Sequence, residues 1–361
     1  MTWDTVNDII SHHRMEPPRM RLARDGETLP LGLYASAVTT RRRTVWHRVD
    51  PARLHAQLAK GATLVLDSVD EIHRPIAAAA TELERWLRTS VQVNVYASLS
   101  ERPGFGLHWD DHDVVVLQLD GAKHWTIHEP TRTAPLHRDV VAPDVPTGPP
   151  VAELVLQAGD ILYLPRGWWH CVSASEGTPS LHATFGLTTT TGAQLVEWVA
   201  DELRSDPTFR LDLPVHGSAA EQRAHLAKLR DRIAETFADP QLVAHFIEAR
   251  DGLDVKRLRP SLPFIEEVPP NPRLRARLLT TRARMDLSQD EHGTVIFRAC
   301  GDEWDFDARA RPLLQLLIEA GRSPVTIHEL SCRSGLSLED VASAISALVA
   351  RQAATVEGAA R

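Results

Sequence analysis

Apolar and polar residues alternate most regularly between residues 91 and 97 of this chain, in the run VQVNVYA. Valine fills alternate positions, and Gln92, Asn94 and Tyr96 lie between them. A period of two is typical of a strand that buries one face. We therefore expect the valines to enter the core. The polar face, with Asn94 and Tyr96, is either an ordinary hydrogen-bonded sheet surface or a surface that contacts a ligand.

The alternation continues through residues 104–128, GFGLHWDDHDVVVLQLDGAKHWTIH. Asp120-Gly121 is typical of a two-residue turn, and the alternating residues on both sides of it predict a β-hairpin. Paired residues of a hairpin share a face. One face would then carry His108, Asp110, His112, Val114, Val116, Gln118, Lys123, Trp125 and Ile127. This predicted face combines two kinds of metal ligand with a cation, Lys123.

His108 and Asp110 would supply an imidazole and a carboxylate from one face of the predicted strand. A second imidazole, His170, follows a strand-like run at 161–164 and a Pro-Arg-Gly turn. Together these three residues would form the two-His-one-carboxylate site of non-haem iron(II) oxygenases, which leaves coordination positions open. A His-x-Asp triplet by itself also occurs on surface strands. His112 lies on the same predicted face, so a ligand set that uses it stays open.

Further short strands with Gly and Pro turns are predicted near 62–67, 152–157, 160–164, 170–175 and 180–187. Many short strands indicate a sandwich or barrel, and their arrangement around the ligand candidates favours the double-sheet jelly roll of cupins for residues 1–190. Amphipathic helices are predicted near 2–14, 51–60 and 74–88. The Pro-rich stretch 129–150 is predicted to be a long loop that could border a substrate cleft.

The pattern changes to helical periodicity after residue 190, with helices predicted over 191–204, 219–237 and 240–249. Their apolar stripes have no strand layer of their own to cover, so they could pack on the barrel, on each other or on a second copy. A Pro-rich linker is predicted at 259–272. Residues 273–361 show strands near 276–286, 293–299 and 303–306, then helices near 310–320, 326–334 and 337–351, which suggests a winged helix. Its last helix offers only Arg351 as a basic residue, which favours protein contact over DNA reading.

Composition narrows the class of partner. The 361 residues carry a formal net charge of −8 with both signs mixed, which argues against bulk electrostatic binding to nucleic acid or to anionic membrane. A local basic patch stays open at Arg41-Arg42-Arg43, where a solvated turn is the simpler interpretation. The three scattered cysteines favour a reducing, cytoplasmic setting. Neither a secretion signal nor an apolar run that could span a bilayer is expected.

Three runs together resemble a known family: NVY followed by GFGLHWDDHDVVVLQLDGAKHW, then GDILYLPRGWWH, then SLHATFGL. They are similar to the JmjC-type cupin oxygenases, and most of all to the ribosomal oxygenases of bacteria and eukaryotes. The resemblance implies a mainly β fold with α: a double-stranded β-helix over 1–190, a helical dimerisation region over 191–258, and a C-terminal winged-helix-like domain over 273–361. It also implies a homodimer. After residue 190 it rests on the order of elements alone.

The resemblance also implies the chemistry: hydroxylation of a protein side chain with Fe(II), 2-oxoglutarate as co-substrate, and O₂. Ribosomal proteins are one class of substrate that it suggests. Carried over by position, the metal ligands are His108, Asp110 and His170. Lys123 would bind the far carboxylate of 2-oxoglutarate, and Asn94 and Tyr96 would lie near the co-substrate. His182 and Thr184, at alternate positions of SLHATFGL, are candidates for the same pocket. No catalytic residue beyond the metal ligands is implied.

Other functions stay open at this point. The same iron site could hydroxylate a small peptide or a natural-product precursor. A metal-binding cupin without 2-oxoglutarate chemistry would have no need of a cation inside the barrel, so Lys123 argues against it. A non-catalytic scaffold would be expected to have lost a ligand of the triad.

Overall fold

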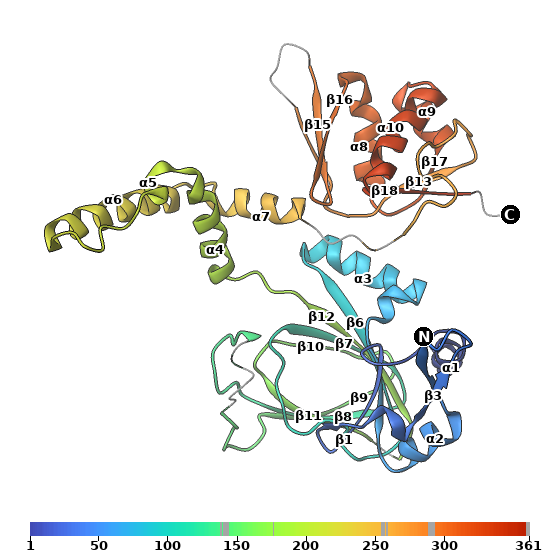
Figure 1. Cartoon of the computed structure of the whole chain (residues 1–361). Coiled ribbons are helices and arrows are strands. Elements are labelled where there is room, and N and C mark those ends of the chain that lie inside the picture. Colours follow the sequence, from blue (N-terminus) through green and yellow to red (C-terminus); the bar gives the residue numbers. More distant parts are fainter. Residues whose placement is uncertain are drawn as a thin grey trace. The chain divides into compact units, whose positions relative to one another are not determined.

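The computed structural model describes residues 1–137, 139, 144–175, 177–253, 257, 259–287 and 293–358 (Figure 1). It divides into two compact units, Met1–Thr189 and Thr190–Arg361. No helix among these residues has the length and apolar character needed to cross a membrane.

The first unit is built from two antiparallel sheets. The larger sheet has the strand order β10-β7-β12-β6-β5-β1-β2, and the smaller has the order β11-β8-β9. The strands of the larger sheet are β1 (Met20–Arg24), β2 (Glu27–Thr28), β5 (Thr63–Leu66), β6 (Val91–Ser98), β7 (Asp113–Asp120), β10 (Ile161–Leu164) and β12 (Ser180–Leu187). Those of the smaller sheet are β8 (Lys123–His128), β9 (Ala152–Leu156) and β11 (Trp169–Ala174). Two facing sheets of this kind agree with the predicted cupin-like fold (Figure 1).

Helices α1 (Trp3–His12), α2 (Pro51–Ala59) and α3 (Arg74–Leu87) contribute to the main core of this unit. The valines of β6 and the apolar residues of β12 join the same core, as the alternation predicted. Asp50 accepts a hydrogen bond from the backbone of Arg53, and Pro51 occupies the first turn, so α2 begins as its sequence suggests. Because one face of β6 and β12 packs in this core, their alternate residues are left to face the opposite sheet.

The predicted hairpin at Asp120-Gly121 is wrong. β7 pairs with β10 and β12, whereas β8 pairs with β9 and β11, so the turn carries the chain from one sheet to the other. Gln118 holds this crossing, because its Nε2 donates to the carbonyl of Asp120 (2.8 Å) and to Ser180 Oγ (2.9 Å). The alternation still identified inward-facing residues, since the inner faces of the two sheets oppose each other.

Residues 15–49, which show no clear pattern of apolar and polar positions, contain four strands. β1 and β2 extend the larger sheet, while β3 (Ala35–Thr39) and β4 (Val45–Val49) pair only with each other. These strands are short, and Ala35 is the one fully buried residue of the β3–β4 pair, so no strong apolar period marks them. The predicted loop at 129–150 includes residues 138 and 140–143, which lie outside the described residues, and its place at a cleft stays a prediction.

The second unit begins with helices α4 (Gly192–Glu202), α5 (Pro207–Arg210), α6 (Ala219–Phe237) and α7 (Leu242–Gly252). Helix α6 has no buried residue, and Leu226, Ile233 and Phe237 on it are exposed. Ser218 caps α6 with a reciprocal hydrogen-bond pair to Glu221, so its start is fixed locally although its sides are uncovered.

The rest of the second unit has its own core. It contains the sheets β17-β13-β18 and β14-β15-β16, with helices α8 (Arg311–Ala320), α9 (Ile327–Ser334) and α10 (Leu338–Ala350). The strands are β13 (Arg275–Leu278), β14 (Arg284–Leu287), β15 (Val295–Ala299), β16 (Asp302–Phe306), β17 (Val325–Thr326) and β18 (Ala354–Glu357). The single strand expected over 276–286 is therefore two strands in different sheets. The winged-helix assignment stays a prediction.

Candidate active site

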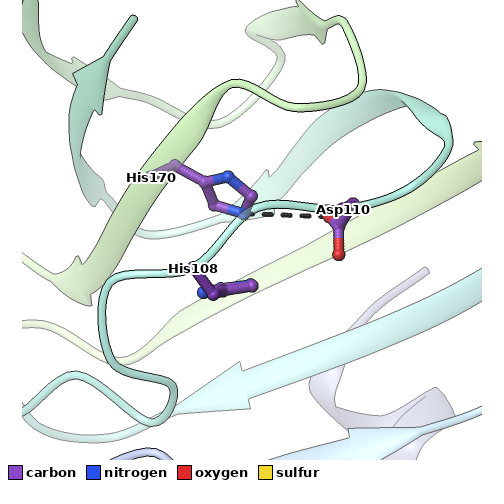
Figure 2. Close-up of side chains that lie close together, drawn as sticks. All are labelled: His108, Asp110 and His170. Carbon is purple, nitrogen blue, oxygen red and sulfur yellow. Dashed lines mark ion pairs between the residues drawn. The ribbon is translucent and has the colours of Figure 1, made fainter. Parts of the chain in front are cut away.

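The structure brings His108, Asp110 and His170 together (Figure 2). His108 and Asp110 lie in the segment before β7 and not within a strand, contrary to the predicted hairpin. An isolated antiparallel bridge replaces that strand: His108 N donates to the carbonyl of His170 (3.1 Å), and His170 N donates to the carbonyl of His108 (2.7 Å). The bridge fixes the two histidine backbones against each other, so the start of β11, at His170, positions His108.

The ligand atoms of these three side chains lie within 4.8 Å of one another. His170 Nε2 is 3.8 Å from Asp110 Oδ2, and the two imidazole centroids are 4.3 Å apart. Figure 2 shows His170 and Asp110 pointing toward each other. Two imidazoles and one carboxylate at this spacing are the donor set of a facial iron(II) site.

Backbone carbonyls orient both imidazoles. His108 Nδ1 is 2.8 Å from the carbonyl of Gly106, and His170 Nδ1 is 3.0 Å from the carbonyl of Trp168. Since a carbonyl only accepts, each Nδ1 carries the proton and each Nε2 keeps its lone pair for a metal. Burial, with a smaller contribution from neighbouring His108, lowers the pKa of His170 to about 4 against the opposing effect of Asp110. His170 is therefore neutral at physiological pH, as a metal ligand must be.

A cavity of about 200 Å³ adjoins the three side chains. Both sheets line it, and its residues are Arg21, Thr63, Tyr96, Gly104, Phe105, His108, Asp110, Val114, Val116, Lys123, Trp125, His170, Val172, His182 and Thr184. Pockets for drug-sized ligands are usually about 300–1,000 Å³, so this cavity suits a more compact ligand.

Lys123 is the buried cation of this cavity. Its side chain is 3% exposed, and Nζ donates to Ser98 Oγ at 2.7 Å. No acidic side chain forms an ion pair with it in the part of the chain that the structure describes. Burial lowers the pKa of Lys123 to about 7. An anionic ligand would offset the cost of burying this charge.

Tyr96, His182 and Trp125 form the aromatic wall beside Lys123. The Tyr96 and His182 rings stack at 4.8 Å, and Trp125 lies edge-on to His182 at 6.1 Å. His182 Nδ1 and Trp125 Nε1 are buried and have no hydrogen-bond partner among the described residues. Burial, with a contribution from Asp110, raises the pKa of Tyr96 to about 12, so its hydroxyl stays protonated. The cavity therefore offers polar groups that a bound ligand could satisfy.

Tyr96 and Asn94, both predicted to lie near the co-substrate, differ in whether they reach the cavity. Tyr96 lines the cavity, but Asn94, two residues earlier on β6, is not among the lining residues. Asn94 Oδ1 instead accepts a hydrogen bond from the backbone of Ser68 at 3.1 Å, where Ser68 has φ 53°. Asn94 thus stabilises a left-handed turn next to the site. His182 and Thr184 both line the cavity.

His112, the alternative ligand, lies outside the three-residue cluster. Its Nδ1 is 3.0 Å from Asp111 Oδ1, and a Cβ on Gly186 would approach its Nε2 to 2.9 Å. The other carboxylate oxygen of Asp111, Oδ2, is 2.8 Å from His137 Nδ1, so Asp111 contacts two histidines. This geometry gives no support to a ligand set that replaces His108 with His112.

Arg21 lines the cavity and was missed by the sequence analysis. Its Nε and one terminal nitrogen donate to the two carboxylate oxygens of Asp67, at 2.9 and 3.2 Å. Its guanidinium also lies 5.4 Å from the centroid of the Phe105 ring. Burial lowers the pKa of Arg21, but the pairing with Asp67 outweighs this and the net shift is upward. Only the pairing of β1 with β5 brings Arg21 here, and nothing near it in the sequence predicts that pairing.

Comparison with known proteins gives a family for part of the chain. Residues 71–195 match the JmjC domain family. The bifunctional lysine-specific demethylase and histidyl-hydroxylase NO66 of Drosophila erecta is 25% identical over 92% of this chain and 51% of that protein. Ribosomal oxygenase 2 of Bos taurus is 33% identical over 37% of this chain and 30% of that protein. The chain thus spans about half or less of these curated relatives.

Solved structures match over nearly the whole length. YcfD, a ribosomal oxygenase from Escherichia coli solved in complex with cobalt and 2-oxoglutarate, is 19% identical, with a TM-score of 0.59. The match covers 99% of this chain and 91% of YcfD. A likeness at this identity concerns the fold. Residues 71–195 thus match the JmjC domain family, and the chain shares the fold of YcfD.

Proposed function

We propose that this protein is an iron(II)- and 2-oxoglutarate-dependent oxygenase that hydroxylates a side chain of a protein substrate. The observation that carries the proposal is Lys123, a buried lysine without an acidic partner among the described residues, in the same cavity as His108, Asp110 and His170. A dicarboxylate that places one carboxylate at Lys123 and its other end at the triad would satisfy both features. The names of the relatives, ribosomal oxygenase and histidyl-hydroxylase, support a protein substrate, and ribosomal proteins are the first class to test.

His108, Asp110 and His170 would hold the metal through two imidazole nitrogens and one carboxylate. Bound iron(II) would supply the activation of O₂, so that 2-oxoglutarate, O₂ and a substrate C–H bond give succinate, CO₂ and a C–OH group. The carbonyls of Gly106 and Trp168 keep both imidazoles in the tautomer that binds metal. The described residues would supply three protein ligands, which would leave room for co-substrate and O₂.

The cavity walls would orient the co-substrate and exclude water. Lys123, anchored by Ser98, would bind the far carboxylate in a charge-assisted hydrogen bond. Val114, Val116 and Val172 make the cavity partly apolar, which strengthens this interaction. Tyr96 lines the same cavity and would contact the co-substrate, whereas Asn94 would act through the turn at Ser68.

The test is succinate formation from 2-oxoglutarate by the purified full chain with Fe(II), ascorbate and O₂, with and without ribosomal proteins. We expect succinate only when Fe(II) is present, none from His108→Ala, and stimulation by the ribosomal proteins. Turnover without stimulation would point to a small peptide or natural-product precursor as the substrate. No succinate under any condition would overturn the oxygenase and favour a metal cupin without 2-oxoglutarate chemistry.

The helices of the second unit support a homodimer as part of this proposal. Residues 191–258 include many exposed apolar side chains, among them Leu211, Val215, Leu226, Ile233, Phe237 and Val243. A 19-residue helix with no buried residue, such as α6, is unusual in a chain that remains monomeric. We take residues 273–361 to be a winged-helix-like domain. Because α10 carries so little basic charge, we infer that this domain contacts protein and not DNA.

A further inference from the structure

The β3–β4 ribbon carries an isolated group of arginines. Residues 35–49, ASAVTTRRRTVWHRV, contain four arginines and no acidic residue, in a chain whose net charge is −8. The strands pair in register from Ala35 with Val49 to Thr39 with Val45. Arg41, Arg42 and Arg43 therefore occupy the tip, and all three are exposed. Arg48 is also exposed, on β4 below the tip.

The tip is a tight, ordered turn. Thr40 N donates to the carbonyl of Thr44 (2.9 Å), Arg43 N donates to the carbonyl of Thr40 (2.9 Å), and Thr44 N donates to Thr40 Oγ1 (3.2 Å). Arg43 has φ 60°, a left-handed conformation that Gly or Asn adopts more easily. A large charged residue at such a position suggests a role for its side chain, since a less strained residue would close the same turn.

These four arginines lack ion-pair partners among the described residues, unlike most other arginines of the first unit. Arg19 pairs with Glu71, Arg21 with Asp67 and Arg53 with Asp50. The acidic residue that contacts the ribbon through His47 is Glu16, which accepts from the backbone of His47 (2.9 Å) and pairs with Arg14 (2.6 Å). Glu16 thus contacts the middle of the ribbon, at His47, and forms no ion pair with the arginines of the tip.

We propose that the β3–β4 ribbon binds the phosphate backbone of RNA. A guanidinium group can bind a phosphate through two parallel N–H···O hydrogen bonds. A two-stranded ribbon can present several arginine side chains together at a groove of a nucleic acid. Trp46 lies on β4 between the tip and Arg48, and Arg14, which pairs with Glu16, lies 5.3 Å from its ring centroid. The choice of RNA over another polyanion rests on the proposed function, because a protein substrate that is part of a ribosome lies next to ribosomal RNA.

The test measures binding of a short fluorescein-labelled RNA hairpin to the full chain by anisotropy, at several salt concentrations and without metal or 2-oxoglutarate. The ribbon variant combines Arg41→Gln, Arg42→Gln and Arg43→Asn, because Asn tolerates the left-handed position. We expect its affinity to fall by at least about tenfold, and the slope of log affinity against log salt to flatten by about 2, because each phosphate contact contributes about 0.7–0.9.

A matched control removes the same charge from exposed basic residues of the same unit for which no ion pair is seen among the described residues: Lys60→Gln, Arg74→Gln and Arg102→Gln. This control should bind RNA nearly as the unaltered protein does. Equal losses in both variants would mean that only net charge matters and would overturn the proposal. No RNA binding by the unaltered protein, or equal binding of a DNA duplex or of polyglutamate, would also overturn it. Because the binding assay needs no turnover, His108→Ala should retain RNA binding, and failure of the oxygenase assay would leave this result intact.

Discussion

Lys123 is the residue whose replacement tests the co-substrate proposal most directly. Lys123→Met keeps the apolar length of the side chain and removes its charge. Loss of one partner of a buried charge pair costs about 3–5 kcal/mol, so affinity for 2-oxoglutarate should fall by about 100-fold or more. Calorimetric titration of 2-oxoglutarate into manganese-loaded protein measures this, and manganese affinity itself should change little. Lys228→Met, at an exposed lysine, is the control. Unchanged co-substrate affinity in Lys123→Met would remove Lys123 from the site.

The same residue predicts a pH dependence. With a pKa near 7 in the free protein, Lys123 is mostly neutral above that pH, and a bound carboxylate raises its pKa again. Binding must then take up a proton, so the Kd for 2-oxoglutarate should rise with pH between about 7 and 9, by up to tenfold per unit. Lys123→Met should lose this dependence as well as affinity, and a flat profile in the unaltered protein would contradict it. Since the folded pKa lies below 10.5, the unfolded chain binds more protons between pH 7 and 10.5, and this lysine makes stability rise with pH there.

The sequence predicted which residues line the cavity better than it predicted the strand pairing that brings them there. His108, Asp110, His170 and Lys123 meet at one cavity, as alternation and the family resemblance suggested. The hairpin argument for that meeting was wrong, because alternation reports which way a side chain points and not which strand lies beside it. Arg21 shows the limit, since its place depends on β1 pairing with β5 more than forty residues away.

At the scale of elements, the crossing between β7 and β8 gives a test of the corrected topology. Gly121 has φ 64°, and a Cβ there would lie 1.9 Å from the carbonyl oxygen of Pro179. Gly177 has φ 65°, but a Cβ there would meet nothing within 4 Å. Both alanine variants bear the left-handed cost of about 1–2 kcal/mol. Gly121→Ala should lose about 1–3 kcal/mol more, because backbone must move to relieve the clash.

The comparison is made by urea unfolding of the full chain, followed by circular dichroism. Equal stability losses in the Gly121 and Gly177 variants would mean that the crossing is loose and that the clash is easily relieved. The sequence alone could not give this result. Asp-Gly predicts a reversal of chain direction, but it does not say whether the two strands pair or enter opposite sheets.

At the scale of the whole molecule, the sequence predicted element order well and sheet membership poorly. Helix α6 spans the predicted range 219–237, because its cap and its periodicity are local. The strand expected at 276–286 is divided between two sheets, since Leu279 and Thr280 are buried between β13 and β14 where no exposed turn residue marks a break. The sequence of one chain says even less about which surface of a second chain covers an exposed helix, because that contact depends on residues of both chains.

The apolar stripe of α6 therefore provides the last prediction. Leu226, Leu229, Ile233 and Phe237 follow each other at helical spacing, and three of them are exposed. If this stripe is the dimer contact, Leu226→Glu with Ile233→Glu should give a monomer by light scattering at micromolar concentration, because two charges would be buried without partners. Leu262→Glu, at a leucine 73% exposed outside these helices, should leave the dimer intact. A monomeric unaltered protein, or a dimer that survives the double change, would place the contact elsewhere and leave the exposed stripe to another partner.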